Sequence, residues 1–510
     1  MGSSGYGSEL LLPLSERLRL PIEQVNFAMC QLFGLLAAFL FRNYLHPSKT
    51  SYTIRHVIVT LLGLHFAFFC FGSYAVHFLG EVILLYCVMV TVHMKSIHKY
   101  SFLVAMAYLT ICQIIRVYVF DGEERSADFS GPLMVITQKI TKLAFELHDG
   151  LARDENELNP SQKRLAVRRI PSLLEYLSYN LNFMGILAGP LNSFNDYINF
   201  IEGRNFEVGT NYLANGKKSN KYPPDEPSSL GAVGCKILIC ALCVFMHLSL
   251  LEVFPVSYNT DDTFIVTAPV PVRLLYLYIS LLACRPKYYF AWTIADAVNN
   301  AAGFGFTGYD SGDKPRWDLL SNLNIVKVEF ATSLKMFIDN WNIQTALWLK
   351  EVCYDRCPFN PTMVTFLLSA LWHGVYPGYY FTFITGMFMT LAARTVRNNL
   401  RPCFLKSPTR KAFYDVVTWA TTQVVVSYTV APFVLPFVDS SFKFYRIWYF
   451  GLHIIAIVLI LVLPKKPNCM SKEQHQLQVA KQTLMKHHCN GQQNGQAIVD
   501  SNQNHQMKID

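Results

Sequence analysis

Two short polar motifs interrupt the apolar second half of the chain, Asp339-Asn340-Trp341-Asn342 and Leu371-Trp372-His373-Gly374. An ionisable imidazole within an apolar run is costly in a bilayer, so its presence indicates a role beyond packing. Imidazole exchanges protons near neutral pH, and a side-chain amide both donates and accepts hydrogen bonds. Asn342 and His373 are 31 positions apart, which leaves room for a helix, a loop and a return. The two motifs together predict a reaction centre inside a membrane.

The composition is that of a polytopic α-helical membrane protein. Hydrophobic residues make up 52% of the 510 residues and charged residues 15%, against roughly 25% charged in an ordinary soluble domain. Several apolar runs approach the about 20 residues that a helix needs to cross a bilayer. They lie at residues 26–45, 57–79, 82–94, 100–120, 231–254, 266–283, 363–393, 414–438 and 445–463. With the shorter stretches between them, they predict an all-α fold with roughly nine to eleven spans.

The apolar region divides the chain into three parts. Residues 1–24 are polar, 25–465 form the membrane domain, and 466–510 are rich in Gln, Asn, His and Lys without apolar periodicity. The last part is predicted to be a disordered tail. Lysines directly after the last apolar run predict that this tail is cytosolic. The net charge of +9 fits loops that face anionic lipid and an anionic substrate, and no basic-aromatic pattern indicates nucleic-acid binding.

The cysteines predict neither a disulfide framework nor a metal site. Their number, 13, is odd, and many stand inside apolar runs, where a free cysteine packs as a small apolar side chain. Cys353 and Cys357 have the spacing of a metal-binding pair, but neither a second pair nor a nearby histidine completes a tetrahedral set. We therefore expect no metal.

Polar residues in the centre of the chain leave two interpretations open. Asp296, Asn299 and Asn300 stand among small residues, so their side chains either join helices by hydrogen bonds or line a substrate cavity. Lys327 and Glu329 belong to an amphipathic stretch that is too polar to span a membrane. We expect these two side chains to form a solvated charged face.

His373 differs from the other histidines of the apolar runs in its neighbours. A histidine in such a run is more often a hydrogen-bonded core residue than a catalyst, and on these residues alone that alternative stays open. Trp372, Gly374 and Tyr376 adjoin His373, and glycine admits close backbone approach while tyrosine supplies a hydroxyl. Structural roles are assigned to the remaining histidines of these runs, His56, His65, His77, His247 and His453.

Trp341-Asn342 followed by Leu371-Trp372-His373-Gly374 resembles the asparagine and histidine pair of the membrane-bound O-acyltransferase (MBOAT) family. The resemblance covers about residues 20–465 and is most specific to the lysophospholipid acyltransferase branch. Within this branch, the chain is most similar to two paralogous enzymes that reacylate lysophosphatidylethanolamine, lysophosphatidylserine and related lysophospholipids. The motifs that carry it are Pro171–Tyr179, Tyr288–Trp292, Gly303–Phe306 and Ser369–Tyr380.

This resemblance implies roughly ten or eleven helices around a buried chamber, open to acyl-CoA from the cytosol and to lipid from the membrane. It implies transfer of an unsaturated acyl chain, such as oleoyl, to the free hydroxyl of lysophosphatidylethanolamine, lysophosphatidylserine or lysophosphatidylcholine, for phospholipid remodelling in the endoplasmic reticulum membrane. His373 would be the general base, and Asn342 would hold the hydroxyl or the oxyanion. Trp341, Trp372 and Tyr376 would contact substrate. A thioester is already activated, so acyl-CoA is a co-substrate and no further cofactor is implied.

The phosphates of acyl-CoA need basic residues, and Arg285 with Lys287 is the predicted pair. Lys335, Lys350 and Arg356 are further candidates, and positive charge flanking a span is the alternative for each.

Two other functions stay open: an MBOAT enzyme that acylates a sterol, a diacylglycerol or a protein, and a polytopic lipid transporter. Repeated halves with broken helices, typical of transporters, are not evident. The oligomeric state and the headgroup do not follow from the sequence.

Overall fold

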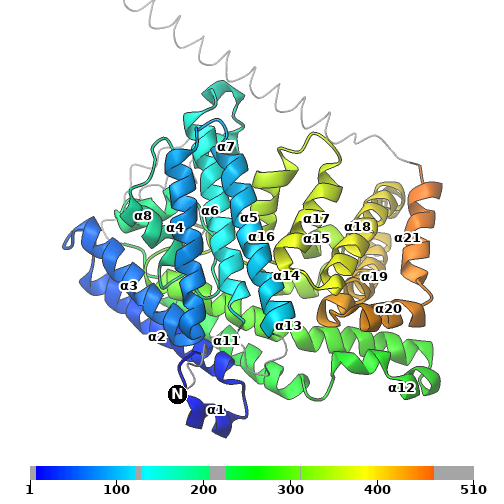
Figure 1. Cartoon of the computed structure of the whole chain (residues 1–510). Helices are drawn as coiled ribbons and strands as arrows, with labels where there is room; N and C mark the ends of the chain where they lie inside the picture. The colour runs from blue at the N-terminus through cyan, green and yellow to red at the C-terminus, as the bar shows by residue number, and fades with distance from the viewer. Residues whose placement is uncertain (1–6, 121–127, 207–225, 311, 465–510) are drawn as a thin grey trace, which may run out of the picture.

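A computed structural model describes residues 7–120, 128–206, 226–310 and 312–464, and almost all regular structure in them is helical (Figure 1). The sheet in these residues is a two-stranded antiparallel hairpin of β1 (Gly308–Tyr309) and β2 (Pro315–Arg316). The all-α prediction is therefore confirmed. The tail predicted at 466–510 lies outside the described residues, and the domain boundaries remain predictions.

The first half of the chain forms long helices, of which α4, α5 and α6 lie side by side (Figure 1). The bounds in this half are α1 (Leu12–Leu18), α2 (Ile22–Tyr44), α3 (Tyr52–Phe71), α4 (Val76–Thr91), α5 (Ile97–Ile115), α6 (Ser130–Leu151), α7 (Pro160–Leu165), α8 (Leu173–Leu181) and α9 (Phe194–Ile201). A π-helical turn, η2 (Arg116–Phe120), continues α5.

In the second half, α11 packs along α13, and α18 packs against α17, α19 and α21. The bounds are α11 (Leu230–Leu250), α12 (Asp262–Thr267), α13 (Val270–Ala301), α14 (Ile325–Glu329), α15 (Leu334–Ile338), α16 (Ile343–Leu349), α17 (Pro361–His373), α18 (Pro377–Phe404), α19 (Pro408–Val434), α20 (Val438–Ile447) and α21 (Gly451–Val462). A π-helical turn, η5 (Lys350–Tyr354), follows α16.

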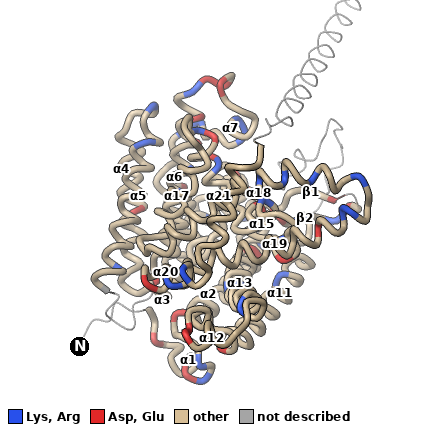
Figure 2. Tube along the Cα trace, turned by 90° about the vertical axis from the view of Figure 1, so that its right-hand side faces the viewer, with Lys and Arg blue, Asp and Glu red and all other residues tan. Residues whose placement is uncertain are grey.

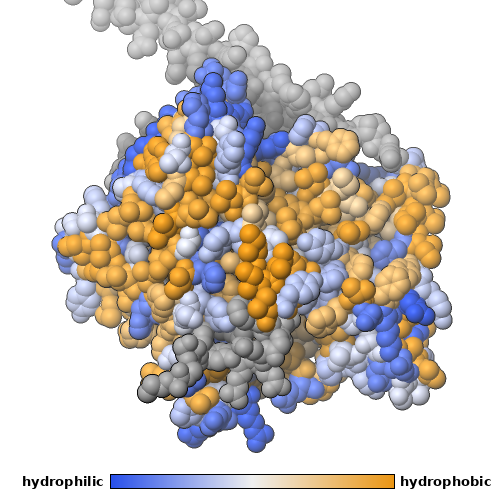
Figure 3. Space-filling model, viewed as in Figure 1, coloured by the Kyte–Doolittle hydropathy of each residue, from blue (hydrophilic) through white to orange (hydrophobic). Residues whose placement is uncertain are grey.

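Several of these helices suit a membrane. Four segments are long and apolar enough to cross one, namely α2, α3 with α4, α5 with η2, and α11, and the pair α20 and α21, bent by 69°, would add a broken span. Apolar residues cover much of the middle of the face seen in Figure 3, with hydrophilic residues above and below. Lysine, arginine and the acidic residues lie mainly on loops and helix ends (Figure 2). The total of nine to eleven membrane spans stays a prediction.

The apolar run 363–393, expected to be continuous, is broken into α17 and α18 directly after His373. The break is at Gly374, whose φ of 139° is strained for any residue with a side chain. A Cβ atom there would also lie 3.2 Å from the ring of Tyr379. The run is therefore two helices because glycine permits a turn at this position, and α17 ends at His373.

The apolar runs do not include α6, yet α6 is buried along most of its length. Its buried residues include polar and charged side chains such as Gln138, Lys139 and Thr141. Such residues lower the mean hydropathy of a segment, which hides the helix from a hydropathy pattern. Their burial is possible because other elements supply hydrogen-bond partners.

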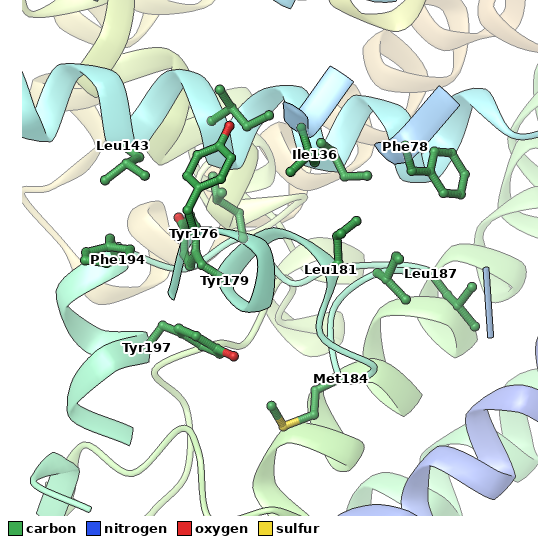
Figure 4. Packing of buried hydrophobic residues seen from close by; sticks show 14 of the residues in the cluster. Phe78, Ile136, Leu143, Tyr176, Tyr179, Leu181, Met184, Leu187, Phe194 and Tyr197 are labelled. Carbon is green, nitrogen blue, oxygen red and sulfur yellow. The ribbon is translucent and has the colours of Figure 1, made fainter. Parts of the chain in front are cut away.

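The helix α8 shows how α6 is covered. Ser172 and Glu175 form a capping box at its start, and hydrogen bonding to Arg169 lowers the pKa of Glu175 to about 2. Its buried tyrosines, Tyr176 and Tyr179, gather with apolar residues of α6 (Figure 4). The ammonium of Lys139 donates a hydrogen bond of 3.0 Å to the Tyr179 carbonyl, in the last turn of α8, where carbonyl groups favour a cation.

Buried apolar side chains form two clusters. The larger one joins the helices of the first half with α16 and α17, through Trp348 and Trp372. The smaller one joins α13, α18, α19 and α20, with Tyr289 and Phe444 among its members. Trp341 packs against the smaller cluster, so the chain passes from one cluster to the other between Trp341 and Trp348.

Arg285 on α13 and Glu329 on α14 form a buried ion pair, with 2.7 Å between nitrogen and oxygen and Arg285 only 6% exposed. The guanidinium also donates to Gln423 of α19, and the Tyr289 hydroxyl donates to the carboxylate. The expectation that Glu329 lies on a solvated charged face is wrong, because its carboxylate neutralises Arg285. Lys327 is exposed, as expected.

Removal of one partner of this pair is expected to destabilise the fold. Glu329→Ala leaves a buried guanidinium without a counter-charge, which typically costs about 3–5 kcal/mol, so the melting temperature in detergent should fall by several degrees. The double variant Arg285→Met/Glu329→Leu removes both charges and should recover much of the lost melting temperature, measured by thermal aggregation in the same detergent. A Glu329→Ala protein that melts like the wild type would contradict the importance of the pair.

Candidate functional site

His373 is the last residue of α17. Its Nδ1 atom lies 2.7 Å from the carbonyl oxygen of Ser369, one turn earlier. Because a carbonyl only accepts hydrogen bonds, Nδ1 carries the hydrogen and Nε2 keeps its lone pair. The side chain is half-buried. The backbone thus selects the tautomer that a general base acting through Nε2 requires.

Aromatic rings surround the imidazole of His373. The ring centroids lie 4.6 Å away for Trp372, 4.7 Å for Phe383, 5.4 Å for Phe433 and 6.3 Å for Tyr379. They come from α17, α18 and α19. These rings fix the ring plane of His373 and lower the local dielectric, which strengthens electrostatic interactions with a reacting group.

Asn342 begins α16 in the left-handed conformation, with φ 49° and ψ 52°, which asparagine tolerates better than most residues. Its half-buried side chain forms no hydrogen bond within the described part of the chain. By contrast, Asn340 donates a hydrogen bond of 2.8 Å to the Met336 carbonyl. Of these two amides, that of Asn342 is the one open to a ligand.

Neighbouring elements hold the turn that carries Asn342. The N–H of Ile343 donates to the Asn322 carbonyl at 2.8 Å. The ring of Trp341 lies 5.3 Å from that of Trp292 on α13. Trp341 therefore supports the turn from the side of α13, and its predicted contact with substrate stays a prediction.

Two buried hydrogen bonds attach α16 to α6. The Gln138 amide donates to the Thr345 hydroxyl, and the Trp348 indole N–H donates to the Thr141 hydroxyl, both at 3.0 Å. Trp348 is fully buried. It stands six residues beyond Asn342, about 9 Å along the helix axis, so α6 fixes the direction in which α16 leaves Asn342.

The same helix, α6, also attaches α17. The indole N–H of Trp372 donates to the Met134 carbonyl at 3.1 Å. The rings of Trp372 and Trp348 lie 5.8 Å apart. Because Trp372 directly precedes His373, one rigid helix sets the position of both predicted catalytic motifs.

The structure thus brings together the helices that carry Asn342 and His373. No hydrogen bond joins the two side chains within the described residues, so a bound substrate would have to connect them. Tyr376 directly precedes α18, and the centroid of its ring lies 5.7 Å from that of Tyr379. Both predicted catalytic residues lie where the two hydrophobic clusters meet, and each retains some exposure.

The amides of Asn299 and Asn300 are committed to packing. Asn299 donates to the Met184 carbonyl at 3.0 Å, and Asn300 donates to the Phe304 carbonyl at 3.0 Å. The Asn300 oxygen accepts a hydrogen bond of 2.7 Å from the Lys236 ammonium. These contacts favour hydrogen bonding between elements over the alternative of a substrate cavity.

The predicted phosphate ligands are placed differently from one another. Arg285 is engaged in its buried ion pair, so the structure argues against it as a phosphate ligand. Lys287 is exposed, with its ammonium 4.9 Å from the centroid of the neighbouring Tyr288 ring. Arg356 forms a bidentate pair with Asp149, whereas Lys350 is exposed.

A basic pocket of about 350 Å³ lies beside the Asn342 turn, with Asn340 in its wall. Its lining residues are Lys327, Ser333, Lys335, Met336, Asp339, Asn340 and Arg397. Lys335 pairs with Asp339, but neither Lys327 nor Arg397 has an acidic partner in the part of the chain that is described. The sequence analysis does not single out Arg397, whose only signal is the arginine spacing 394, 397 and 401 along α18.

Comparison with known proteins identifies the family of this chain. The family model of the membrane-bound O-acyltransferases matches residues 28–431. The chain is 60% identical over 476 residues to membrane-bound glycerophospholipid O-acyltransferase 2 of Gallus gallus, covering 93% of this chain and 92% of that protein. It is 55% identical over 470 residues to membrane-bound glycerophospholipid O-acyltransferase 1 of Homo sapiens, covering 92% and 95%. It is 41% identical over 460 residues to lysophospholipid acyltransferase 6 of Drosophila melanogaster, covering 90% and 64%.

The family predicted from the two motifs is thereby confirmed. The apolar helices and the family match also make the chain a multi-pass membrane protein. The chain belongs to the membrane-bound O-acyltransferase (MBOAT) family of acyltransferases.

Proposed function

We propose that the chain is a lysophospholipid acyltransferase that uses acyl-CoA. The O–H bond of the acceptor glycerol and the C–S bond of the thioester break, and an ester C–O bond forms. The proton passes from the hydroxyl to His373 and then to the departing CoA thiolate. The observation that carries this proposal is the hydrogen bond from His373 Nδ1 to the Ser369 carbonyl, which leaves Nε2 able to accept the proton.

Asn342 is proposed to stabilise the charge that develops on the thioester oxygen, or to hold the acceptor hydroxyl. Its amide NH₂ is a hydrogen-bond donor without a protein acceptor among the described residues, and such a donor aimed at an oxyanion acts without reorganisation. Its side chain does not cap the helix that follows, so the amide is not used by the backbone of α16.

The basic pocket is the proposed entrance for acyl-CoA. Lys327 and Arg397, which have no acidic partner among the described residues, offer positive charge for phosphate oxygens. Asn399, one half-turn beyond Arg397, donates to the Pro464 carbonyl at 3.0 Å, and two lysines follow Pro464 in the sequence. By the positive-inside rule this end of the molecule faces the cytosol, where a water-soluble acyl donor is available.

The acceptor is proposed from the relatives. The name of lysophospholipid acyltransferase 6 of Drosophila melanogaster specifies a lysophospholipid as its substrate. The names of the chicken and human relatives specify a glycerophospholipid. A lysophosphatidylethanolamine, lysophosphatidylserine or lysophosphatidylcholine acceptor, an oleoyl-like donor and location in the endoplasmic reticulum membrane complete the proposal. A panel of lysophospholipid headgroups assayed with one acyl-CoA would rank the acceptors.

The alternatives make different predictions for the same preparation. Purified chain in lipid nanodiscs should release CoA from oleoyl-CoA only when a lysophospholipid is added. Release with a sterol, a diacylglycerol or a peptide instead would favour another MBOAT acceptor. Lipid movement without CoA release would favour a transporter.

Substitution of the proposed base should abolish turnover. His373→Ala removes the proton acceptor, so kcat should fall by at least about 10²-fold, the usual contribution of a general base. CoA release per folded protein measures this, with folding checked by size-exclusion chromatography. His247→Ala on α11 is the matched control and should retain most activity. A well-folded His373→Ala protein with more than a tenth of wild-type turnover would exclude the role.

Alanine variants of Asn342 and Asn340 should distinguish a role in catalysis from a role in holding the turn. Asn342→Ala should lower kcat by roughly 10²-fold, as expected for loss of one oxyanion donor. Asn340→Ala removes the hydrogen bond to Met336 and should cost thermal stability more than turnover. Both quantities are measured on both variants, and equal losses of turnover would mean that the turn, rather than the Asn342 amide, is what matters.

Charge reversal in the pocket should weaken donor binding alone. Lys327→Glu/Arg397→Glu should raise the KM for acyl-CoA by about tenfold or more, since each lost charge-assisted contact approaches 1.4 kcal/mol, while kcat changes little. Added salt should raise the wild-type KM by screening. Lys287→Glu is the matched control, because Lys287 is the exposed member of the pair that the sequence predicts. A raised KM in Lys287→Glu alone would move the entrance there.

A further inference from the structure

Gln113 on α5 is a buried polar residue that the proposed chemistry does not use. It is 3% exposed, and its amide Nε2 donates a hydrogen bond of 3.1 Å to the carbonyl oxygen of Trp372. The two residues are 259 positions apart in the sequence. Gln113 therefore contacts the motif that contains His373, although α5 carries none of the motifs found in the sequence.

The acceptor of this hydrogen bond belongs to the unprotected end of a helix. The last carbonyl groups of α17 have no partner within the helix. Gly374 N–H satisfies the carbonyl of Ala370, and Gln113 satisfies that of Trp372. Gln113 thus fixes the last turn of α17, the turn in which Ser369 orients the His373 imidazole.

Packing places Gln113 against the break itself. A Cβ atom added to Gly374 would lie 3.7 Å from Gln113 Cδ and 3.2 Å from the ring of Tyr379. Gln113 and Tyr379, which is also a ring neighbour of His373, therefore enclose the glycine that lets the chain turn after the proposed base.

The other amide atom, Gln113 Oε1, is buried and has no hydrogen-bond partner among the described residues. A buried acceptor without a partner costs free energy. An apolar residue of the same length would avoid that cost, but it would leave the buried Trp372 carbonyl without its donor, so packing alone does not explain an amide at this position. The contact with Trp372 is what remains to explain it.

We propose that Gln113 is a positioning residue for the reaction: it holds the end of α17 so that His373 Nε2 points at the acceptor hydroxyl. This inference rests on the proposed role of His373. Misplacement of a reacting group by about 1 Å can cost up to 10²-fold in rate, and it acts on kcat rather than on substrate binding.

The test is Gln113→Met, which keeps the side-chain length and removes the hydrogen-bond donor. In nanodiscs, kcat per folded protein should fall by about tenfold or more, with the KM values for oleoyl-CoA and lysophospholipid within about twofold of wild type. Thermal stability should fall only modestly, because the Trp372 carbonyl loses its donor while the volume of the side chain is kept. Gln31→Met, the same change at a buried glutamine of α2, is the matched control and should leave kcat unchanged.

Two outcomes would overturn the inference. One is wild-type kcat in Gln113→Met, and the other is a loss confined to the yield of folded protein, which would make Gln113 a packing residue. The proposed function fails separately, if the wild type does not acylate lysophospholipid or if His373→Ala stays active. With an inactive His373→Ala and a fully active Gln113→Met, only the positioning role is lost.

Discussion

The reaction centre depends on hydrogen bonds that α6 makes to the indoles of two buried tryptophans. Thr141 accepts from the Trp348 indole, and the Met134 carbonyl accepts from the Trp372 indole. Inside a membrane protein, helix association gains little from the hydrophobic effect, so packing and such hydrogen bonds decide how helices sit. Each bond also has a large aromatic side chain behind it. α16 and α17 consequently keep a fixed relation to α6, and through it to each other.

The seam between the two hydrophobic clusters explains why the site stays accessible. Trp341 packs on one cluster and Trp348 on the other, while Asn342 between them is only half-buried. His373 likewise ends a helix of the first cluster and precedes α18 of the second. A residue in the middle of either cluster would be closed to substrate. At the seam, a polar side chain gains rigid surroundings without complete burial.

Much of the candidate site could be predicted from the sequence, because its residues are chemically unusual where they stand. A histidine and an asparagine amide beside apolar runs stand out, and the order of the motifs identifies the family. What could not be predicted depends on partners distant in the chain. Arg285 reads as a free cation until Glu329 is found beside it, and Asn299 reads as a possible ligand until Met184 is found in contact.

The helix α6 shows the same limit for the fold. Its buried Gln138, Lys139 and Thr141 make it look like a polar segment, because hydropathy counts the side chain and not its partner. The break at Gly374 is the opposite case, since an apolar run conceals a turn that only backbone geometry reveals. Local pattern therefore locates the chemistry better than it locates the supports of that chemistry.

The attachment of α16 and α17 to α6 has a consequence for biosynthesis. The anchors on α6 leave the ribosome 207 and 238 residues before the tryptophans that they bind. During that interval Thr141 and Gln138 lack their final partners, and polar groups facing lipid are costly. The nascent chain must therefore shelter α6 among helices made before α16 and α17, such as α4, α5 and α8, which pack on it. The wall of the reaction centre is then assembled first, and α16 and α17 are made later and dock onto a surface that already exists.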